Sequence, residues 1–188
     1  MLNDDLKLMK LIDIIHNRDL TKYLILGFST LVLVLILQKF FLLVVLIGVS
    51  LVISYFTGTY QSKTIGIELV TFTTVLAGFA FGPTTGALIG LILITTHLTI
   101  GHFAFGPYIF WTIPFYVAVG ILSGTLTGVE FTTLGIYTII AINALSLVLT
   151  AITFPQNLGV YIPFAVTNIL FNVIIFSQFG PLIYSLVK

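Results

Sequence analysis

Charged residues are scarce in this 188-residue chain, where they make up 7% of the sequence, against about 25% in an ordinary soluble domain. The hydrophobic fraction is 59%, more than a soluble domain of this length can bury in one core. The remaining apolar side chains would have to face water, which excludes a soluble globular fold. Lipid is therefore the expected solvent for most of the surface.

Cysteine is absent, which excludes disulfides, a thiolate nucleophile and cysteine-ligated metal sites. The net charge of +1 is too small for a nucleic-acid partner, which would need clustered lysine and arginine. Motifs of hydrolases, phosphate-binding loops and zinc proteases are also missing. His97 and His102 are five residues apart and so point to different sides of a helix. We expect no enzyme activity, no cofactor and no metal site.

Eight of the thirteen charged side chains lie in the first 22 residues. In this segment Leu8, Leu11, Ile12 and Ile15 follow the i, i+3, i+4, i+7 spacing of an amphipathic helix. Residues 1–22 are therefore predicted to form an interfacial helix on the membrane surface. The alternative is a solvated helical tail that packs on a neighbouring subunit.

Long apolar runs predict a transmembrane bundle over residues 23–188, since about 20 residues cross the hydrocarbon core. The runs cover residues 23–37, 40–56, 65–81, 85–100, 108–127, 131–154 and 160–187. The first two are expected to form a tight hairpin, because one long crossing would place the charge of Lys39 at mid-depth. The predicted fold is an all-α membrane protein with a compact bundle of seven helices, or six if the first pair is one bent element.

Glycine and proline recur at regular positions in the apolar part. The string FAFGP at residues 79–83 returns at residues 103–107, either as a short duplication or as a helix-ending turn used twice. Glycines follow every fourth residue at positions 78, 82, 86 and 90 and at positions 120, 124 and 128. Such ladders let helices approach closely in lipid. Because Pro83 interrupts the first ladder, it predicts a close-packed hairpin of two helices.

Glu68 and His97 are nearly the only ionisable side chains in the apolar runs, and the cost of burying such groups makes them functional candidates. Glu68 is expected one turn into a helix, either as an interfacial carboxylate that can pair with Lys63 or as a ligand contact. His97 shares a helix face with Gly86 and Gly90, which should point into the bundle. It either donates to a neighbouring helix or contacts a ligand.

Aromatic and amide side chains are the other candidates. Trp111 and Tyr116 begin the fifth run, where they form either an aromatic belt at the membrane interface or a wall on which a flat ligand stacks. Asn143, Asn168 and Asn172 are amides inside apolar helices, and the last two share one face. These amides either hold helices together or bind a polar ligand.

Two strings carry a family resemblance: Glu68-Leu69-Val70, and AGFAFGPTTGALIG at residues 77–90. They resemble the helix, Gly-Pro turn and second helix of the substrate-binding S components of energy-coupling factor (ECF) transporters. The resemblance implies capture of a vitamin or micronutrient, with a transmembrane coupling subunit and ATPases as partners. The Ala-x-x-x-Ala pattern with which that family docks its coupling subunit is missing from residues 23–37 and 40–56.

We therefore expect a multi-pass protein of the cell membrane that binds a small solute between its helices. The predicted binding residues are Glu68, His97, Trp111, Tyr116, Asn143, Asn168 and Asn172. The expected partners are the lipid bilayer, the solute, and the coupling subunit with its ATPases or other membrane subunits.

Two alternatives remain open from the sequence. The first is a structural or accessory subunit of a larger membrane complex, for which a filled interior is expected in place of a cavity. The second is an intramembrane enzyme, which requires His97 to lie within hydrogen-bonding reach of a serine or a carboxylate.

Overall fold

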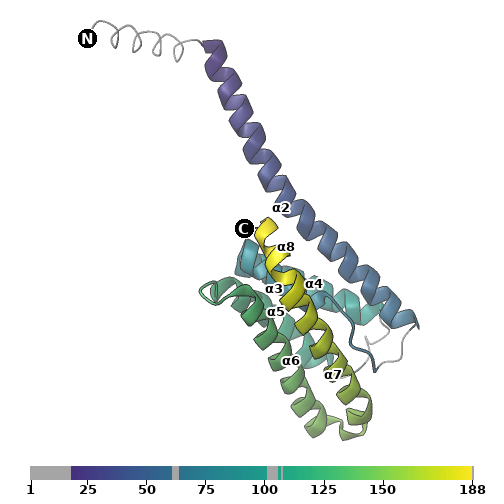
Figure 1. Cartoon of the computed structure of the whole chain (residues 1–188). Coiled ribbons are helices and arrows are strands. Elements are labelled where there is room, and N and C mark those ends of the chain that lie inside the picture. The colour runs from purple at the N-terminus through teal and green to yellow at the C-terminus, as the bar shows by residue number, and fades with distance from the viewer. Residues whose placement is uncertain (1–17, 61–63, 101–105, 107, 188) are drawn as a thin grey trace, which may run out of the picture. The chain divides into compact units, whose positions relative to one another are not determined.

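The computed structural model describes residues 18–60, 64–100, 106 and 108–187. Within these ranges every regular element is helical, which confirms the all-α prediction for this part of the chain. The elements are α2 (Arg18–Tyr60), α3 (Val70–Phe81), α4 (Pro83–Ile100), α5 (Ile109–Thr125), α6 (Phe131–Thr153), η1 (Pro155–Asn157), α7 (Leu158–Ile174), η2 (Ile175–Phe179) and α8 (Gly180–Val187) (Figure 1).

Four helical stretches in the described part of the chain are long and apolar enough to cross a membrane. They are Leu20–Thr59, Pro83–Ile100, Phe131–Thr153 and Pro155–Val187. Helices α3 and α5 are apolar but shorter, and the 12 residues of α3 rise only about 18 Å. These lengths fit a membrane protein, while the number of crossings stays a prediction.

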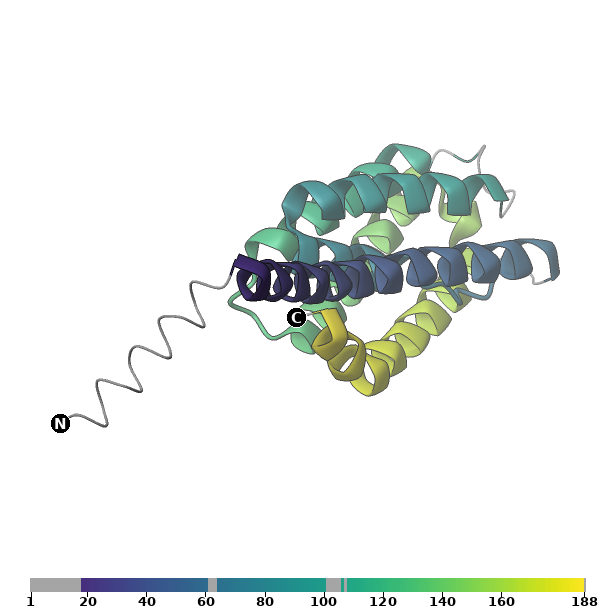
Figure 2. The ribbon, with the colours of Figure 1, turned by 90° about the horizontal axis from the view of Figure 1, so that it is seen from above.

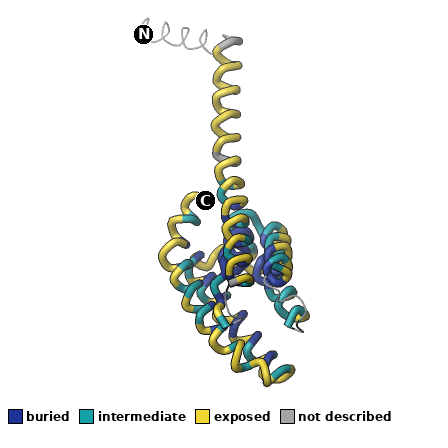
Figure 3. Tube along the Cα trace, turned by 90° about the vertical axis from the view of Figure 1, so that its right-hand side faces the viewer, coloured by how far each residue is buried: buried dark blue, intermediate teal, exposed yellow. Residues whose placement is uncertain are grey.

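The chain divides into two compact units, residues 1–41 and 42–188. In the first unit the described side chains of α2 from Leu20 to Val34 are all exposed, as the yellow stretch of the tube shows (Figure 3). The predicted interfacial helix lies outside the described residues as far as Asn17, and α2 already includes residues 18–22.

The predicted hairpin around Gln38 and Lys39 is wrong, because α2 continues through both residues without a break. Neither residue ends a helix, since glutamine and lysine are good helix formers and no glycine or proline lies beside them. The cost of burying Lys39 did not decide the local structure, and its side chain is half-buried. The first two apolar runs, residues 23–37 and 40–56, thus belong to one helix, as in the alternative with six helices.

Helix α3 begins at Val70, five residues later than the apolar run suggests, so the prediction of Glu68 within a helix is wrong. The Glu68 carboxylate instead accepts the backbone N–H of Thr71 at 2.9 Å, one of the donors that a helix N-terminus leaves unpaired. Capping by this side chain explains why the helix begins after it.

The first FAFGP string forms the turn between α3 and α4. Gly82 has φ of +93° and donates its N–H to the carbonyl of Gly78, and this conformation strongly favours glycine. Pro83 follows as the first residue of α4, where a missing N–H costs nothing. The second copy, apart from Gly106, lies outside the described residues.

The glycine ladders bring the backbones of α3, α4 and α5 together. A Cβ added to Gly86 would meet the Cα of Gly78 and the carbonyl of Gly120, and one added to Gly124 would meet the backbone of Pro83. The predicted close-packed hairpin is confirmed, and the second ladder lies against it. Packing of this kind provides the attraction that the hydrophobic effect cannot supply between helices in lipid.

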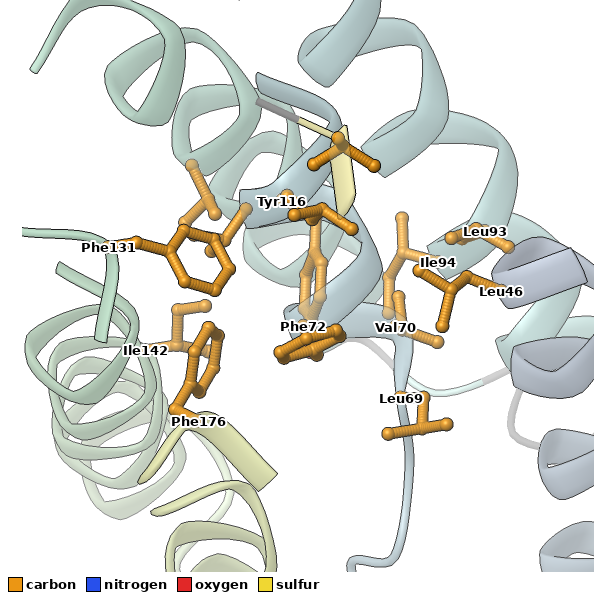
Figure 4. Close-up of a cluster of buried hydrophobic side chains, with 14 of the residues drawn as sticks. Leu46, Leu69, Val70, Phe72, Leu93, Ile94, Tyr116, Phe131, Ile142 and Phe176 are labelled. Carbon is orange, nitrogen blue, oxygen red and sulfur yellow. The ribbon is translucent and has the colours of Figure 1, made fainter. Parts of the chain in front are cut away.

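Three phenylalanine rings join α3, α6 and η2 in the core of residues 42–188. Figure 4 shows Phe72, Phe131 and Phe176 turned toward one another, with ring centroids 5.0 to 5.9 Å apart. Tyr116 and Ile142 belong to the same buried cluster. Both also line the cavity described below, so the core and the cavity share walls.

Helices α7 and α8 are joined without a gap by η2, a short π-helical segment. Pro181 explains the irregularity, because it has no N–H to donate to the preceding turn and its ring crowds that turn. The continuous helical stretch of α7, η2 and α8 changes direction where α8 begins (Figure 2). The run predicted over residues 160–187 is thus one continuous but bent element.

Glu130 caps α6, in line with its interpretation as a structural loop residue. Its carboxylate accepts the N–H groups of Thr132 and Thr133 at 2.9 and 2.7 Å. Slight burial raises the pKa of Glu130, but the hydrogen bonds from these two threonines outweigh it and lower the pKa to about 2. The carboxylate is therefore charged whenever the cap forms at neutral pH.

Glu130→Ala is expected to lower the free energy of unfolding by about 1 kcal/mol at pH 7, as for other lost caps. Because the pKa of Glu130 is lower in the folded protein, its charged carboxylate stabilises the fold at pH values above its ordinary pKa of 4.5. This stabilisation is lost as the pH falls toward about 2. Thermal unfolding of the wild type and of Glu130→Ala at several pH values measures how the difference in stability depends on pH. A difference that stays constant over the whole acid range would contradict the capping role.

Candidate functional site

The unit of residues 42–188 contains a cavity of about 310 Å³. Its walls come from α4, α5, α6 and α7 and from the segment that precedes α3. Six of the seven predicted site residues line it, namely Glu68, His97, Trp111, Tyr116, Asn143 and Asn168. The seventh, Asn172, is fully buried and donates a hydrogen bond to Glu68. The fold thus brings together residues that are as far as 104 positions apart.

The Glu68 carboxylate is held by four hydrogen bonds from neutral groups. Oε2 accepts the N–H of Thr71, and Oε1 accepts the Thr71 hydroxyl at 2.7 Å and the amides of Asn168 and Asn172 at 3.2 and 3.1 Å. The residue is 2% exposed, so its carboxylate does not snorkel to solvent, whereas its position relative to the membrane interface stays a prediction. Lys63, its predicted partner, lies outside the described residues.

A chain of amides fixes which way these groups point. Asn143 Nδ2 donates to the Ile139 carbonyl and to Asn168 Oδ1, both at 2.9 Å. Because Asn168 Oδ1 is occupied in this way, its Nδ2 faces Glu68 Oε1 as a donor. The two alternatives for the asparagines are therefore not exclusive: they join α6, α7 and the segment before α3, and two of them also face the cavity.

The non-helical segment before α3 is tied to α7 through Gly66. Its N–H donates to Thr167 Oγ1 at 2.8 Å, and its carbonyl accepts Asn168 Nδ2 at 2.7 Å. A Cβ at Gly66 would collide with Asn168 and with the Phe164 carbonyl, so glycine is required for this approach. These bonds hold Glu68 in place against α7.

On the other side of Glu68, hydroxyl groups continue the polar network. The Thr71 hydroxyl, which donates to Glu68, lies 2.9 Å from the hydroxyl of Tyr116 on α5. Since the single Thr71 proton goes to Glu68, the Tyr116 hydroxyl is the donor in this pair. Tyr116 is buried, and its ring forms part of the cavity wall.

His97 is held by a serine of α2. Its Nδ1 lies 2.8 Å from Ser54 Oγ, and Ser54 donates its proton to the Ser50 carbonyl at 2.7 Å. Nδ1 therefore carries the ring proton and donates to Ser54, which leaves Nε2 as the acceptor of the neutral ring. The position of His97 on the buried face of α4 confirms the periodicity argument.

This pair meets the distance condition of the intramembrane-enzyme alternative, but its geometry does not favour nucleophilic catalysis. Ser54 is fully buried and is not among the residues that line the cavity. Its proton points to a carbonyl, whereas a nucleophilic serine must pass its proton to the histidine. Among the described residues no cluster of three or more histidine, aspartate or glutamate side chains could hold a metal ion.

Aromatic side chains from two helices line the cavity. Trp111 is half-buried on α5. Tyr161 and Phe164 lie on α7 with their ring centroids 5.8 Å apart and their planes inclined by 30°. Polar groups at Glu68 and aromatic faces thus border the same space, a combination typical of sites for small organic ligands.

The polar residues of the cavity wall that were not predicted include Ser146, Thr150 and Tyr161. A signal for them exists in the sequence. Ser146 and Thr150 follow Asn143 at i+3 and i+7 and continue its face of α6, and Tyr161 precedes Asn168 by seven residues on α7. All three would have been found by searching the same helix face as Asn143 and Asn168 for further polar residues.

Comparison of the chain with protein-family models, curated proteins and solved structures found no match. The similarity to S components of ECF transporters thus remains a prediction from two short strings.

Proposed function

We propose that this protein is a membrane-embedded solute-binding subunit of an uptake transporter for a vitamin or another micronutrient. The observation that carries this proposal is the cavity of about 310 Å³, which is lined by both polar groups and aromatic rings. This volume is at the lower end of the range of about 300–1,000 Å³ for small-molecule sites. The four candidate spans support insertion into the cell membrane.

The polar network is more elaborate than helix packing requires. One asparagine between two helices is enough to join them in lipid, yet here Glu68, Asn143, Asn168 and Tyr116 border one space. Burying a carboxylate in an apolar bundle is costly, and such groups are expected where they serve a ligand or an ion. A cavity of this composition favours solute binding over a purely structural role.

Energy for uptake would come from partner subunits. The sequence has no Walker A motif, so the chain itself is not expected to hydrolyse ATP. A transmembrane coupling subunit with ATPases, as the resemblance to S components implies, would supply it. In this arrangement the chain captures the solute and its partners drive its release.

A role as an accessory subunit of a larger complex is the second candidate. The observation that favours it is the apolar surface of α2 over residues 20–34, where every described side chain is exposed. Such a surface requires lipid or another apolar helix as its neighbour. A subunit with this role alone would have no small-molecule ligand.

Trp111 provides a direct test, because it is the single tryptophan of the chain and lines the cavity. We expect one compound of a vitamin panel to change its fluorescence and to raise the melting temperature of the purified, lipid-embedded protein. A ligand at 100 times its Kd stabilises the native state by about 2.7 kcal/mol. If no compound of the panel produces either signal, binding of a vitamin is rejected and the accessory role is favoured.

Two variants of α6 distinguish the cavity from other binding surfaces. Asn143→Leu removes a polar group from the cavity wall and should weaken binding about tenfold or more. Tyr137→Phe changes a strongly exposed side chain of the same helix and should leave binding unchanged. Equal affinities of the two variants would place the ligand outside the cavity.

A further inference from the structure

Few basic side chains are available to balance the charge of Glu68: Lys63, five residues earlier, lies outside the described residues, and His97 is the basic side chain on the described cavity wall. From Thr64 to Val187 the chain contains two carboxylates, Glu68 and Glu130, and no lysine or arginine. Glu130 is exposed and caps α6. Glu68 is buried in the wall of the cavity. A buried ion without a counter-charge costs several kcal/mol even when it is hydrogen-bonded.

The hydrogen bonds of Glu68 indicate that it is held as a carboxylate. The N–H of Thr71 can only donate, and the amide of Asn168 must donate because its oxygen is already occupied by Asn143. All four hydrogen bonds of the Glu68 side chain are accepted by its oxygens, the pattern expected of a carboxylate. The donors are neutral, so they stabilise the negative charge without cancelling it.

One carboxylate oxygen retains capacity for a further donor. Oε1 accepts three hydrogen bonds, whereas Oε2 accepts one, from the N–H of Thr71. Each carboxylate oxygen has two lone pairs, so Oε2 can accept another N–H group. A cationic donor here would form the stronger, charge-assisted type of hydrogen bond.

The rings around the cavity suit a flat cation. Trp111, Tyr116 and Tyr161 present π-systems to the same space as Glu68, and such rings attract cations as well as apolar surfaces. The one basic side chain on the described cavity wall is His97, whose Nδ1 proton is directed to Ser54.

We propose that the solute is a small planar organic cation whose N–H groups bind Glu68 and whose ring lies among Trp111, Tyr116 and Tyr161. This inference rests on the proposed solute-binding function and specifies the chemical class of the solute. The carboxylate selects the charge, and the aromatic walls select a flat ring. Anions of the same shape are rejected by the negative charge of Glu68.

Three probes of one shape and different charge test the inference: benzamidine, benzamide and benzoate. Their binding is measured by Trp111 fluorescence with the full chain in nanodiscs of uncharged phosphatidylcholine. We expect benzamidine to bind about tenfold or more tightly than benzamide, the difference expected for a charge-assisted hydrogen bond, and benzoate not to bind. Equal affinities of benzamidine and benzamide, or tighter binding of benzoate, overturn the inference.

Two matched variants locate the charge that selects the cation. Glu68→Gln should bring the affinities for benzamidine and benzamide within about twofold of each other, because it removes the negative charge and keeps the shape. Glu130→Gln makes the same chemical change outside the cavity and should preserve the preference. If Glu68→Gln also preserves it, Glu68 does not select the cation. If the glutamine variant does not fold, Glu68→Asp is measured instead. It keeps the charge and should therefore keep the preference for benzamidine, and loss of that preference would count against the inference.

The outcomes also separate this inference from the function on which it rests. If a neutral or anionic vitamin binds while benzamidine does not, the protein is a solute-binding subunit and the cation inference is wrong. If neither the vitamin panel nor the three probes change Trp111 fluorescence or the melting temperature, both proposals are wrong.

Discussion

Gly120→Ala is expected to lower the melting temperature markedly, although alanine is the better helix former. A Cβ at this position would collide with the carbonyl group of Gly86 and the backbone nitrogen of Ala87. Backbone atoms cannot rotate away as the end of a side chain can, so α4 and α5 would have to separate. Overpacking costs about 1–3 kcal/mol or more, and we expect a net loss of about 2 kcal/mol after the gain in helix propensity.

Gly48→Ala is the matched control for this change. Gly48 lies inside α2 within the same unit, and nothing lies within 4 Å of its added Cβ. Here only helix propensity acts, so stability should stay constant or rise by up to about 1 kcal/mol. Both variants are compared by thermal unfolding in one detergent, followed by circular dichroism. Equal stabilities would mean that α4 and α5 do not meet at their backbones.

The second large effect is expected for Glu68→Ala, which should cost roughly 3 kcal/mol of unfolding free energy. The change leaves the buried N–H of Thr71 without an acceptor, at about 1–3 kcal/mol, and adds the cost of the space that the missing side chain filled. The amides of Asn168 and Asn172 contribute less to this cost, because each still donates to a second acceptor. Asn168 Nδ2 donates to the carbonyl of Gly66, and Asn172 Nδ2 donates to the carbonyl of Asn168.

Glu130→Ala is the natural comparison, since both glutamates accept backbone N–H groups at the start of a helix. They differ in burial, so the exposed cap should cost about 1 kcal/mol and the buried one several times more. Unfolding by heat or by denaturing detergent measures the difference. If the two variants lose the same stability, the network around Glu68 does not support the fold.

Helical periodicity explains the part of the site that could be predicted from the sequence. Asn168 and Asn172 share a face because they are four residues apart, and His97 follows the glycine face of α4 for the same reason. These relations are local, so the sequence contains them. The contact between Asn143 and Asn168 depends on how α6 packs against α7, and no spacing along the chain predicts it.

Two features could not be predicted, and both concern how helices begin and continue. Hydropathy treats residues 65–81 as one run, but the side chain of Glu68 caps the helix, and the segment before it is not helical. At Lys39 the expected cost of burial argued for a turn, whereas local propensity kept the helix intact. In both places backbone hydrogen bonding outweighed the hydropathy pattern.

The pairing of Gly66 with α7 also restricts how this chain can diverge. Gly66 is bonded to Thr167 and Asn168, while Glu68, two residues later, is bonded to Asn168 and Asn172. An insertion or deletion of one residue between Gly66 and Thr71 would break one set of bonds or the other. Despite its lack of helix, this stretch should therefore keep a constant length in any descendant that keeps the cavity.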